Sequence, residues 1–279
     1  ELIVYAGSTL YRINKDTGET IKTGKMAGSS SFSINGPTYA DGMIFVALTN
    51  GVVQAFDADS LESLWIYHDP LKGQPNCPIT VSNGYAYTGF WNSETRDASF
   101  VCLPIADERP TASNEEKYAA WRHVQTGGFY WAGACVQNGV LLVGTDDGQD
   151  STSPVLSTGR VLLFDAATGA LLDEVGGICG DVRSTICYDS GSNAYYATSK
   201  GGEFIRIKLD ATGRKIDSKQ TLKLQNGTTS VAMSTSTPVV YKGRAYVGVS
   251  GSSQFYAYSG HNITVIDLDG AMSIAYRVP

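Results

Sequence analysis

Few residues of this chain have the types and spacing that catalysis or metal binding requires. The loop from Asp146 to Ser151 gathers three carboxylates, and oxygen-rich loops can hold Ca²⁺. It lacks the EF-hand pattern and its terminal Glu, so the sequence favours a solvated polar loop over a metal site. The three His residues share no motif, and the Gly-x-Ser-x-Gly pattern of hydrolases is absent. We therefore predict no metal site and assign no catalytic residue.

The five Cys residues have spacings that match no zinc pattern. Cys135 and Cys187 fall inside apolar runs, where Cys behaves as a small apolar residue. We favour structural thiols for all five. The alternative is one disulfide that involves Cys179, and the sequence does not name its partner.

An aromatic segment is the strongest candidate for a binding surface. Residues 127–131 read Gly-Gly-Phe-Tyr-Trp, and Trp91 lies in a second connection that we expect on the same face. Aromatic rings give contact area at low entropy cost, which suits sugars or peptides. The segment could equally be ordinary core, and both interpretations stay open. The predicted ligand-binding residues are Trp91, Phe129, Tyr130 and Trp131, and we expect Phe255, Tyr256 and Tyr258 to extend the same face.

The elements that would position these residues are short strands in a repeated unit. Residues 138–175 alternate apolar runs with Asn-Gly and Thr-Gly turns. Asn-Gly before an apolar run indicates a β-hairpin, since both turn positions need a positive φ. With a short strand before it, the unit predicts a four-stranded antiparallel meander, whose strands we name A to D.

This unit recurs along the whole chain. Turns that end strand C begin at Asn14 and Asp57, which are 43 residues apart, and at Asp165 and Leu209, which are 44 apart. A period of roughly 40–45 residues is typical of four-stranded propeller blades. We therefore predict an all-β fold, a β-propeller of about six four-stranded antiparallel blades, which forms a single domain over residues 1–279.

Two departures from the repeat are expected. The first blade has strands B, C and D only, because nothing precedes Leu2 to serve as strand A. We expect the chain to be a segment of a longer surface protein, or a neighbouring segment or molecule to cover the inner edge of residues 2–6. In the third blade a polar excursion over 107–118 replaces the Thr-Gly turn, and residues 113–118 are a candidate for one short helical turn.

Composition narrows the class of partner. The chain has 31 Gly, 17% charged residues and a net charge of −6, which argues against nucleic acid as a partner. No run of 18 apolar residues is present, so no transmembrane helix is predicted. Oligomeric state is not indicated.

The repeat resembles the PQQ-like propeller repeat. That repeat is shared by quinoprotein alcohol dehydrogenases, the outer-membrane assembly lipoprotein BamB and many secreted bacterial proteins. Trp65 and Trp121 match its docking Trp in strand D, whereas Thr23 and Glu174 depart from it. For the dehydrogenases the resemblance implies eight blades, an adjacent Cys pair under the quinone and a bound Ca²⁺. No two Cys are adjacent here, so we predict no cofactor.

Three functions follow from these expectations. The first is a secreted or cell-surface bacterial binding module, without catalysis, for a carbohydrate, peptide or protein on the loop face. The second is an enzyme whose acidic residues converge on the aromatic face; a quinoprotein dehydrogenase is disfavoured. The third is a periplasmic assembly scaffold like BamB. Fold alone does not choose among them.

Overall fold

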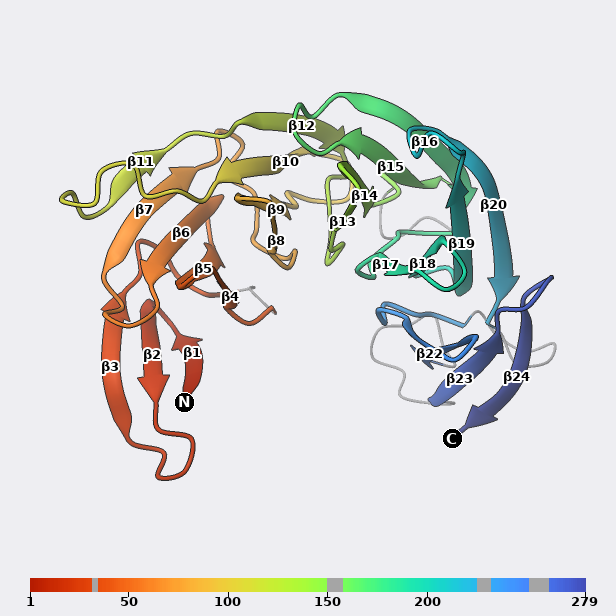
Figure 1. Ribbon diagram of the computed structural model, residues 1–279, viewed down its shortest axis with the longest axis horizontal. Helices are drawn as coiled ribbons and strands as arrows, with labels where there is room; N and C mark the ends of the chain where they lie inside the picture. The colour runs from red at the N-terminus through yellow and green to blue at the C-terminus, as the bar shows by residue number, and fades with distance from the viewer. Residues whose placement is uncertain (32–34, 150–157, 225–231, 251–260) are drawn as a thin grey trace. The chain divides into compact units, whose positions relative to one another are not determined.

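Every regular element among the described residues is a β-strand (Figure 1). The computed structural model describes residues 1–31, 35–149, 158–224, 232–250 and 261–279. In these residues there is no helix that could span a membrane. The chain divides into two compact units, Glu1–Phe129 and Tyr130–Pro279. The described strands form six sheets, three in each unit, as predicted for about six blades. That residues 1–279 form one domain stays a prediction.

The first unit holds the first three blades. The first sheet has the order β1 (Leu2–Ala6), β2 (Thr9–Ile13) and β3 (Thr20–Lys25). The second contains β4 (Thr38–Ala40), β5 (Met43–Leu48), β6 (Val52–Asp57) and β7 (Ser63–His68), with β11 (Glu115–Lys117) outside β7. The third contains β8 (Thr80–Ser82), β9 (Tyr85–Gly89), β10 (Asp97–Pro104) and β12 (Trp121–Thr126).

The second unit holds three four-stranded sheets, each in sequence order. The fourth sheet contains β13 (Cys135–Gln137), β14 (Val140–Gly144), β15 (Gly159–Asp165) and β16 (Leu171–Ile178). The fifth contains β17 (Cys187–Asp189), β18 (Ala194–Thr198), β19 (Glu203–Leu209) and β20 (Ile216–Lys223). The sixth contains β21 (Val239–Tyr241), β22 (Arg244–Val249), β23 (Asn262–Asp267) and β24 (Ser273–Val278).

The turns between strands A and B have the predicted chemistry. Asn83-Gly84 and Asn138-Gly139 have positive φ at both positions, 50° and 80° in the first and 50° and 78° in the second. Those values match a two-residue hairpin turn whose twist suits the flanking strands. The Asn-Gly signal depends on adjacent residues alone, and the backbone of these turns has the geometry that it predicts.

The turns between strands C and D are fastened by an acidic or amide side chain. Asp165 Oδ1 accepts hydrogen bonds from the backbone N–H groups of Ala167 and Thr168, at 3.2 and 2.9 Å. A hydrogen bond from Arg214, together with those from Thr168, lowers the pKa of Asp165 to about 2. Because Arg214 lies in the same turn of the next blade, this contact also joins two neighbouring blades.

The excursion over residues 107–118 differs from the prediction. Its candidate helical turn is wrong, because Glu115–Lys117 forms β11, which pairs in parallel with β7 (Figure 1). The side chains of Glu115 and Lys117 are buried in this strand, where they are 5% and 4% exposed. Lys117 Nζ donates a hydrogen bond to Ala106 O at 2.7 Å. The Lys117 ammonium also lies 5.6 Å from the centre of the Trp65 ring. The excursion therefore closes the outer edge of the second blade.

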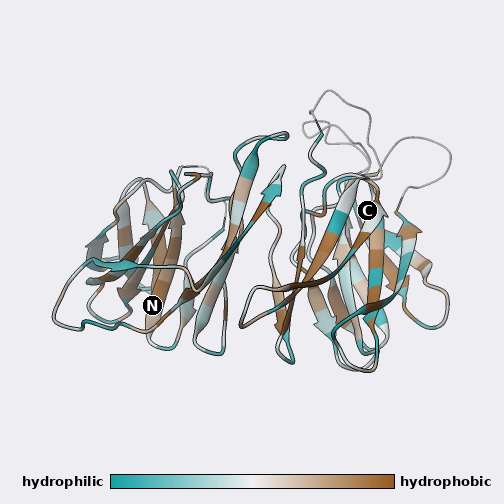
Figure 2. Ribbon diagram, turned by 90° about the horizontal axis from the view of Figure 1, so that it is seen from above, coloured by the Kyte–Doolittle hydropathy of each residue, from teal (hydrophilic) through white to brown (hydrophobic). Residues whose placement is uncertain are grey.

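The hydrophobic core lies between neighbouring sheets of each unit. Hydrophobic residues, in brown, recur along the strands (Figure 2). In the first unit one cluster contains Phe45, Trp65 and Val101, from the second and third sheets. In the second unit another contains Leu163 and Ile205, from the fourth and fifth. This two-sided burial explains why the strands read as nearly continuous apolar runs.

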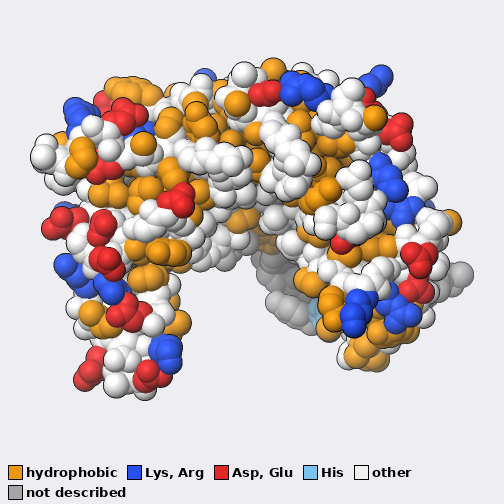
Figure 3. All heavy atoms as spheres, in the orientation of Figure 1, with side chains coloured by type: hydrophobic (Ala, Val, Ile, Leu, Met, Phe, Trp, Pro, Cys, Tyr) orange, Lys and Arg blue, Asp and Glu red, His pale blue; other side chains and the backbone are white. Residues whose placement is uncertain are grey.

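The first sheet lacks strand A, as predicted. Among the described residues β1 pairs only with β2. Leu2 and Val4 on β1 are 51% and 39% exposed, and apolar side chains are visible among the charged ones in Figure 3. What covers the inner edge of β1 stays a prediction.

Neighbouring blades of the second unit touch backbone to backbone. Gly201 N donates to Cys179 O at 3.0 Å, and a Cβ on Gly201 would lie 2.1 Å from that oxygen. A real Cβ cannot occupy that position, so the contact requires glycine. This contact helps to tie the connection before the fifth blade to the turn between β18 and β19.

Gly201→Ala should lower the free energy of unfolding by about 1–3 kcal/mol, because the added methyl forces the two connections apart. Urea unfolding followed by far-UV circular dichroism measures the change. Gly248→Ala in the same unit is the control, since its Cβ would meet only Ser236 at 3.6 Å. Equal stability of both variants would contradict the close contact.

Candidate functional site

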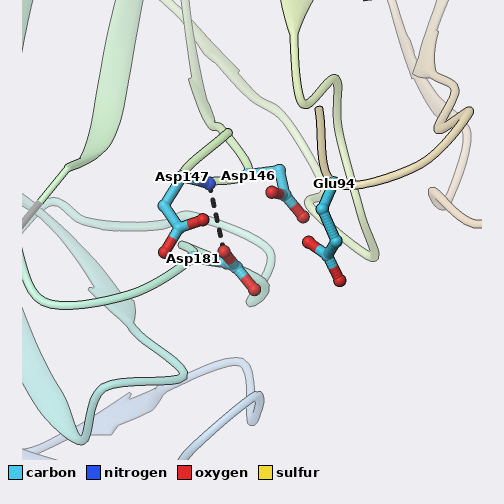
Figure 4. A group of neighbouring side chains, drawn as sticks. All are labelled: Glu94, Asp146, Asp147 and Asp181. Atoms are coloured by element: carbon cyan, nitrogen blue, oxygen red, sulfur yellow. Dashed lines mark hydrogen bonds between the residues drawn. The ribbon is translucent and has the colours of Figure 1, made fainter. Parts of the chain in front are cut away.

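Charged side chains gather in the connections of the second unit. Asp146 and Asp147 follow β14, Asp181 and Arg183 lie between β16 and β17, and Lys200 follows β18. Figure 4 shows how the three aspartates face one another. Backbone hydrogen bonds fix their connections, because Val182 N donates to Thr145 O at 3.0 Å and Lys200 N donates to Asp181 O at 2.8 Å.

Asp181 is the centre of this ion network. Its Oδ2 atom lies 2.5 Å from Arg183 Nη2 and 3.3 Å from Lys200 Nζ. Its Oδ1 atom accepts a hydrogen bond from Asp147 N at 3.0 Å (Figure 4). Arg183 Nη2 also lies 3.7 Å from Asp146 Oδ2. Since Asp146 and Asp181 are almost fully buried, these contacts provide the pairing that a buried charge requires.

The two carboxyl groups of Asp147 and Asp181 are shifted in opposite directions. Burial, and then the nearby negative charge of Asp181, raise the pKa of Asp147 to about 6. Burial alone would raise the pKa of Asp181 as well, but Arg183 and Lys200 hold it below its ordinary value. The pair therefore favours a proton on Asp147 and a charge on Asp181.

Three carboxylates in one place raise the question of a metal ion. Oxygens of Asp146, Asp147 and Asp181 lie within 4.8 Å of one another, which is a spacing that Ca²⁺ could bridge. Arg183 and Lys200 already neutralise two of the three charges. Within the second unit the three aspartates therefore form an ion network with Arg183 and Lys200.

The prediction of a solvated loop is wrong at its first residue. Asp146 is 2% exposed, and Asp147 and Gln149 are half-buried. The cause is Arg183, which comes from the next connection and supplies a counter-charge that the loop's own sequence lacks. The rest of that loop, 150–157, is outside the described residues.

An aromatic pair adjoins the ion network. The rings of Tyr130 and Trp131 are stacked, with centres 4.7 Å apart and planes at 22°. The Arg183 guanidinium lies 4.2 Å from the centre of the Tyr130 ring and 5.4 Å from that of Trp131. Trp131 has a φ of 60°, which is unusual for a bulky residue. Arg183 thus braces two half-buried rings on one side while Asp146 and Asp181 hold it on the other.

The four predicted binding residues fall into two groups. Tyr130 and Trp131 lie in the second unit and are half-buried, as described above. Trp91 and Phe129 lie in the first unit. Trp91 is half-buried, and its backbone pairs with Gln74 in an isolated β-bridge.

Phe129 is core rather than surface. It is fully buried, its ring centre is 5.1 Å from that of Phe100, and its carbonyl accepts a hydrogen bond from Cys77 Sγ. Of the two interpretations of the aromatic segment, ordinary core therefore applies to Phe129. That Trp91, Tyr130 and Trp131 share one face and bind a ligand stays a prediction. Phe255, Tyr256 and Tyr258 lie outside the described residues.

Sequence reasoning missed Asp181, Arg183 and Lys200. The available signal was the segment 178–183, Ile-Cys-Gly-Asp-Val-Arg, in which two opposite charges stand two residues apart among apolar and small residues. A charged pair inside such a segment is a candidate for burial with partners. Its partners, however, lie 35 residues before and 19 residues after Asp181, at Asp146 and Lys200.

Comparison with known proteins supports the fold. Residues 1–90 match a family model described as outer membrane protein assembly factor BamB, which agrees with the PQQ-like repeat in that part. The structure of BamB from Moraxella catarrhalis is similar, with a TM-score of 0.66 and 14% identity over 99% of this chain and 72% of that chain. No curated protein matches the chain.

Two further solved structures are similar at low identity. The propeller domain of Cps50 (Swd1) from Myceliophteria thermophila has a TM-score of 0.57 and 9% identity over 97% of this chain and 80% of that chain. Quinohemoprotein alcohol dehydrogenase from Comamonas testosteroni has a TM-score of 0.54 and 15% identity over 84% of this chain and 39% of that chain. At these identities the likeness confirms the β-propeller fold class, and activity does not follow from it.

Asp147→Asn should stabilise the protein at pH 8 by about 1–2 kcal/mol. A raised folded pKa means that the wild type loses stability as the pH rises through about 6, because Asp147 must then ionise beside Asp181. The neutral amide avoids that loss, so the difference should vanish near pH 4. Urea unfolding at both pH values measures it.

Asp217→Asn, at an exposed position in the same unit, is the control for loss of a carboxylate outside the ion network. An Asp147→Asn variant that is less stable than the wild type at pH 8 would contradict the preference for a proton on Asp147.

Proposed function

We propose that this chain is a non-catalytic propeller module that holds a segment of a protein partner on the Tyr130–Trp131 pair. The observation that carries the proposal is the geometry of that pair: two stacked, half-buried rings, one of them in a left-handed backbone conformation. The propeller fold and the likeness to BamB support a scaffold role.

The aromatic pair has the properties of a prepared binding surface. A left-handed conformation in a bulky residue costs about 1–3 kcal/mol and persists only where its surroundings enforce it. Arg183 is one contact that holds the rings, because its guanidinium lies over them and is itself anchored by Asp181. Rings held in advance lose little entropy on binding, and Trp and Tyr dominate many protein interfaces for that reason.

A hydrolytic enzyme is the second candidate, and one observation favours it. Asp147 has a pKa near 6, within the range of a general acid or base, and it adjoins an ionised Asp181. The ion pairs of Asp181 with Arg183 and Lys200 favour the structural alternative, since they already occupy the carboxylate beside Asp147. A screen of glycan and peptide hydrolysis tests this, and turnover abolished by Asp147→Asn would establish the enzyme.

The envelope is the proposed location. The matched family description concerns the outer membrane, which favours the periplasmic alternative over a secreted or cell-surface protein. Cell fractionation of the source organism, followed by immunodetection, tests the assignment.

Trp131→Ala should weaken binding of a partner peptide by about 2 kcal/mol or more, because the ring would be a buried anchor in the complex. The measurement is titration calorimetry with a peptide selected from a displayed library, and a glycan array tests carbohydrate as the ligand instead. The matched variant is Phe129→Ala, which should lower the free energy of unfolding by about 3–5 kcal/mol, since that ring is fully buried.

If Trp131→Ala leaves every ligand's affinity unchanged while lowering stability as Phe129→Ala does, the pair is core and the proposed site is wrong. Enrichment of glycans alone would replace the protein partner by a carbohydrate.

Addition of pyrroloquinoline quinone with Ca²⁺ should leave the melting temperature unchanged, because the sequence has no adjacent Cys pair to lie under the cofactor. Thermal denaturation with and without the quinone measures this, since a ligand of the folded state raises apparent stability. A shift, or dye-linked alcohol oxidation, would overturn the prediction of no cofactor.

A further inference from the structure

A groove in the first unit runs along the outer strand of the first blade. Its volume is about 1000 Å³. One wall is β3 with Met26 and Ala27, and the opposite wall consists of the turn at 60–62, the start of β7 and residues 110–114 of the excursion. The groove lies within the described residues and is separate from the Tyr130–Trp131 pair.

The β3 wall is an open strand edge. Among the described residues β3 pairs only with β2. Met26 N donates to Ser8 O at 2.9 Å, and antiparallel pairing alternates bonded with non-bonded positions. Thr23 and Lys25 therefore direct their backbone N–H and C=O groups away from β2. Both residues are exposed and line the groove.

The neighbouring blade shows how such an edge is covered. β7 is the equivalent outer strand of the second blade, and Glu115, Glu116 and Lys117 pair with it in parallel. The added strand β11 widens the second blade by one strand (Figure 1). No described strand does the same for β3, so the second blade has one more outer strand than the first. The groove lies beside β3, where the first blade has no such strand.

The charge of the edge indicates what kind of segment fits. β3 carries Lys22 and Lys25 and no acidic residue, in a chain whose net charge is −6. Acidic side chains opposite lysines stabilise strand pairs, and like charges do the reverse. The far wall contributes Glu62 and Asp107, so acidic groups of an occupant belong on the β3 side.

We propose that this groove binds an extended acidic segment of a partner protein, which adds to β3 as a further strand. The backbone groups of Thr23 and Lys25 would supply the hydrogen bonds, and Lys22 and Lys25 would select acidic side chains. This is recognition by strand addition, in which main-chain bonds give affinity and side chains give specificity. It does not depend on the function proposed for the second unit.

The test selects a phage library of random eight-residue peptides against the full chain. We expect enriched peptides to carry acidic residues three positions apart, because Lys22 and Lys25 are three apart and lie on opposite faces of β3. We also expect them to lack proline, because proline cannot pair along a strand. A synthetic copy of the most enriched peptide is then titrated against variants by fluorescence anisotropy.

Thr23→Pro should weaken that peptide's binding by about tenfold or more, because it removes one outward N–H from the edge. Proline is tolerated at such an outward position, so the β2–β3 pairing should persist. Thr23→Val keeps the N–H and should leave the affinity within about twofold of the wild type. The double change Lys22→Glu with Lys25→Glu should also weaken binding about tenfold, and it keeps the test valid if Thr23→Pro fails to fold.

Three results would overturn the proposal. The selection could yield no enriched peptide, or mainly basic ones. The selected peptide could bind Thr23→Pro and Thr23→Val equally well. Sedimentation could show that the wild-type chain self-associates through an edge that Thr23→Pro disrupts, which would assign the groove to a second copy of the chain.

Discussion

Close backbone contact between neighbouring blades is the constraint on which the second unit depends. A Cβ at Gly159 would lie 2.0 Å from Gly180 O, and one at Gly201 would lie 2.1 Å from Cys179 O. Both contacts involve the connection that carries Asp181 and Arg183. Because that connection is held against the start of β15 and the turn after β18, it brings its charges within reach of Asp146 on one side and Lys200 on the other. The ion network is thus a consequence of backbone packing.

The same network shows how burial and charge are balanced. Burying a carboxylate costs several kcal/mol unless charged or hydrogen-bonding partners replace water. Asp181 has two cations and a backbone N–H as partners, whereas Asp147 forms no ion pair among the described residues and has a pKa shifted toward the neutral form. Arg183 faces rings on one side and carboxylates on the other, so it links the electrostatics of the network to the position of Trp131. The proposed binding surface and the joint between blades therefore share Arg183.

In the first unit, one outer strand is covered by an added strand and another has no added strand among the described residues. In the first unit the excursion after β10 returns to the second blade and covers β7, so one edge is closed from within the chain. Lys117 and Glu115 are buried there, which shows that an added strand can bring charged side chains along when they find partners. The edge of β3 beside it has no such segment among the described residues.

The sequence alone determined what is local. Asn-Gly and Asp-containing turns fix hairpins over a few residues, and their period indicates blades, so the class of fold and the absence of strand A from the first sheet followed without coordinates. Tertiary structure decided what depends on distant partners. The parallel pairing of β11 joins residues about 50 positions apart. Asp146 is buried because Arg183 reaches it, and Phe129 is core while its neighbours Tyr130 and Trp131 are half-buried. Turn chemistry acts between adjacent residues, whereas burial and charge pairing depend on which blades meet, and no local pattern records that.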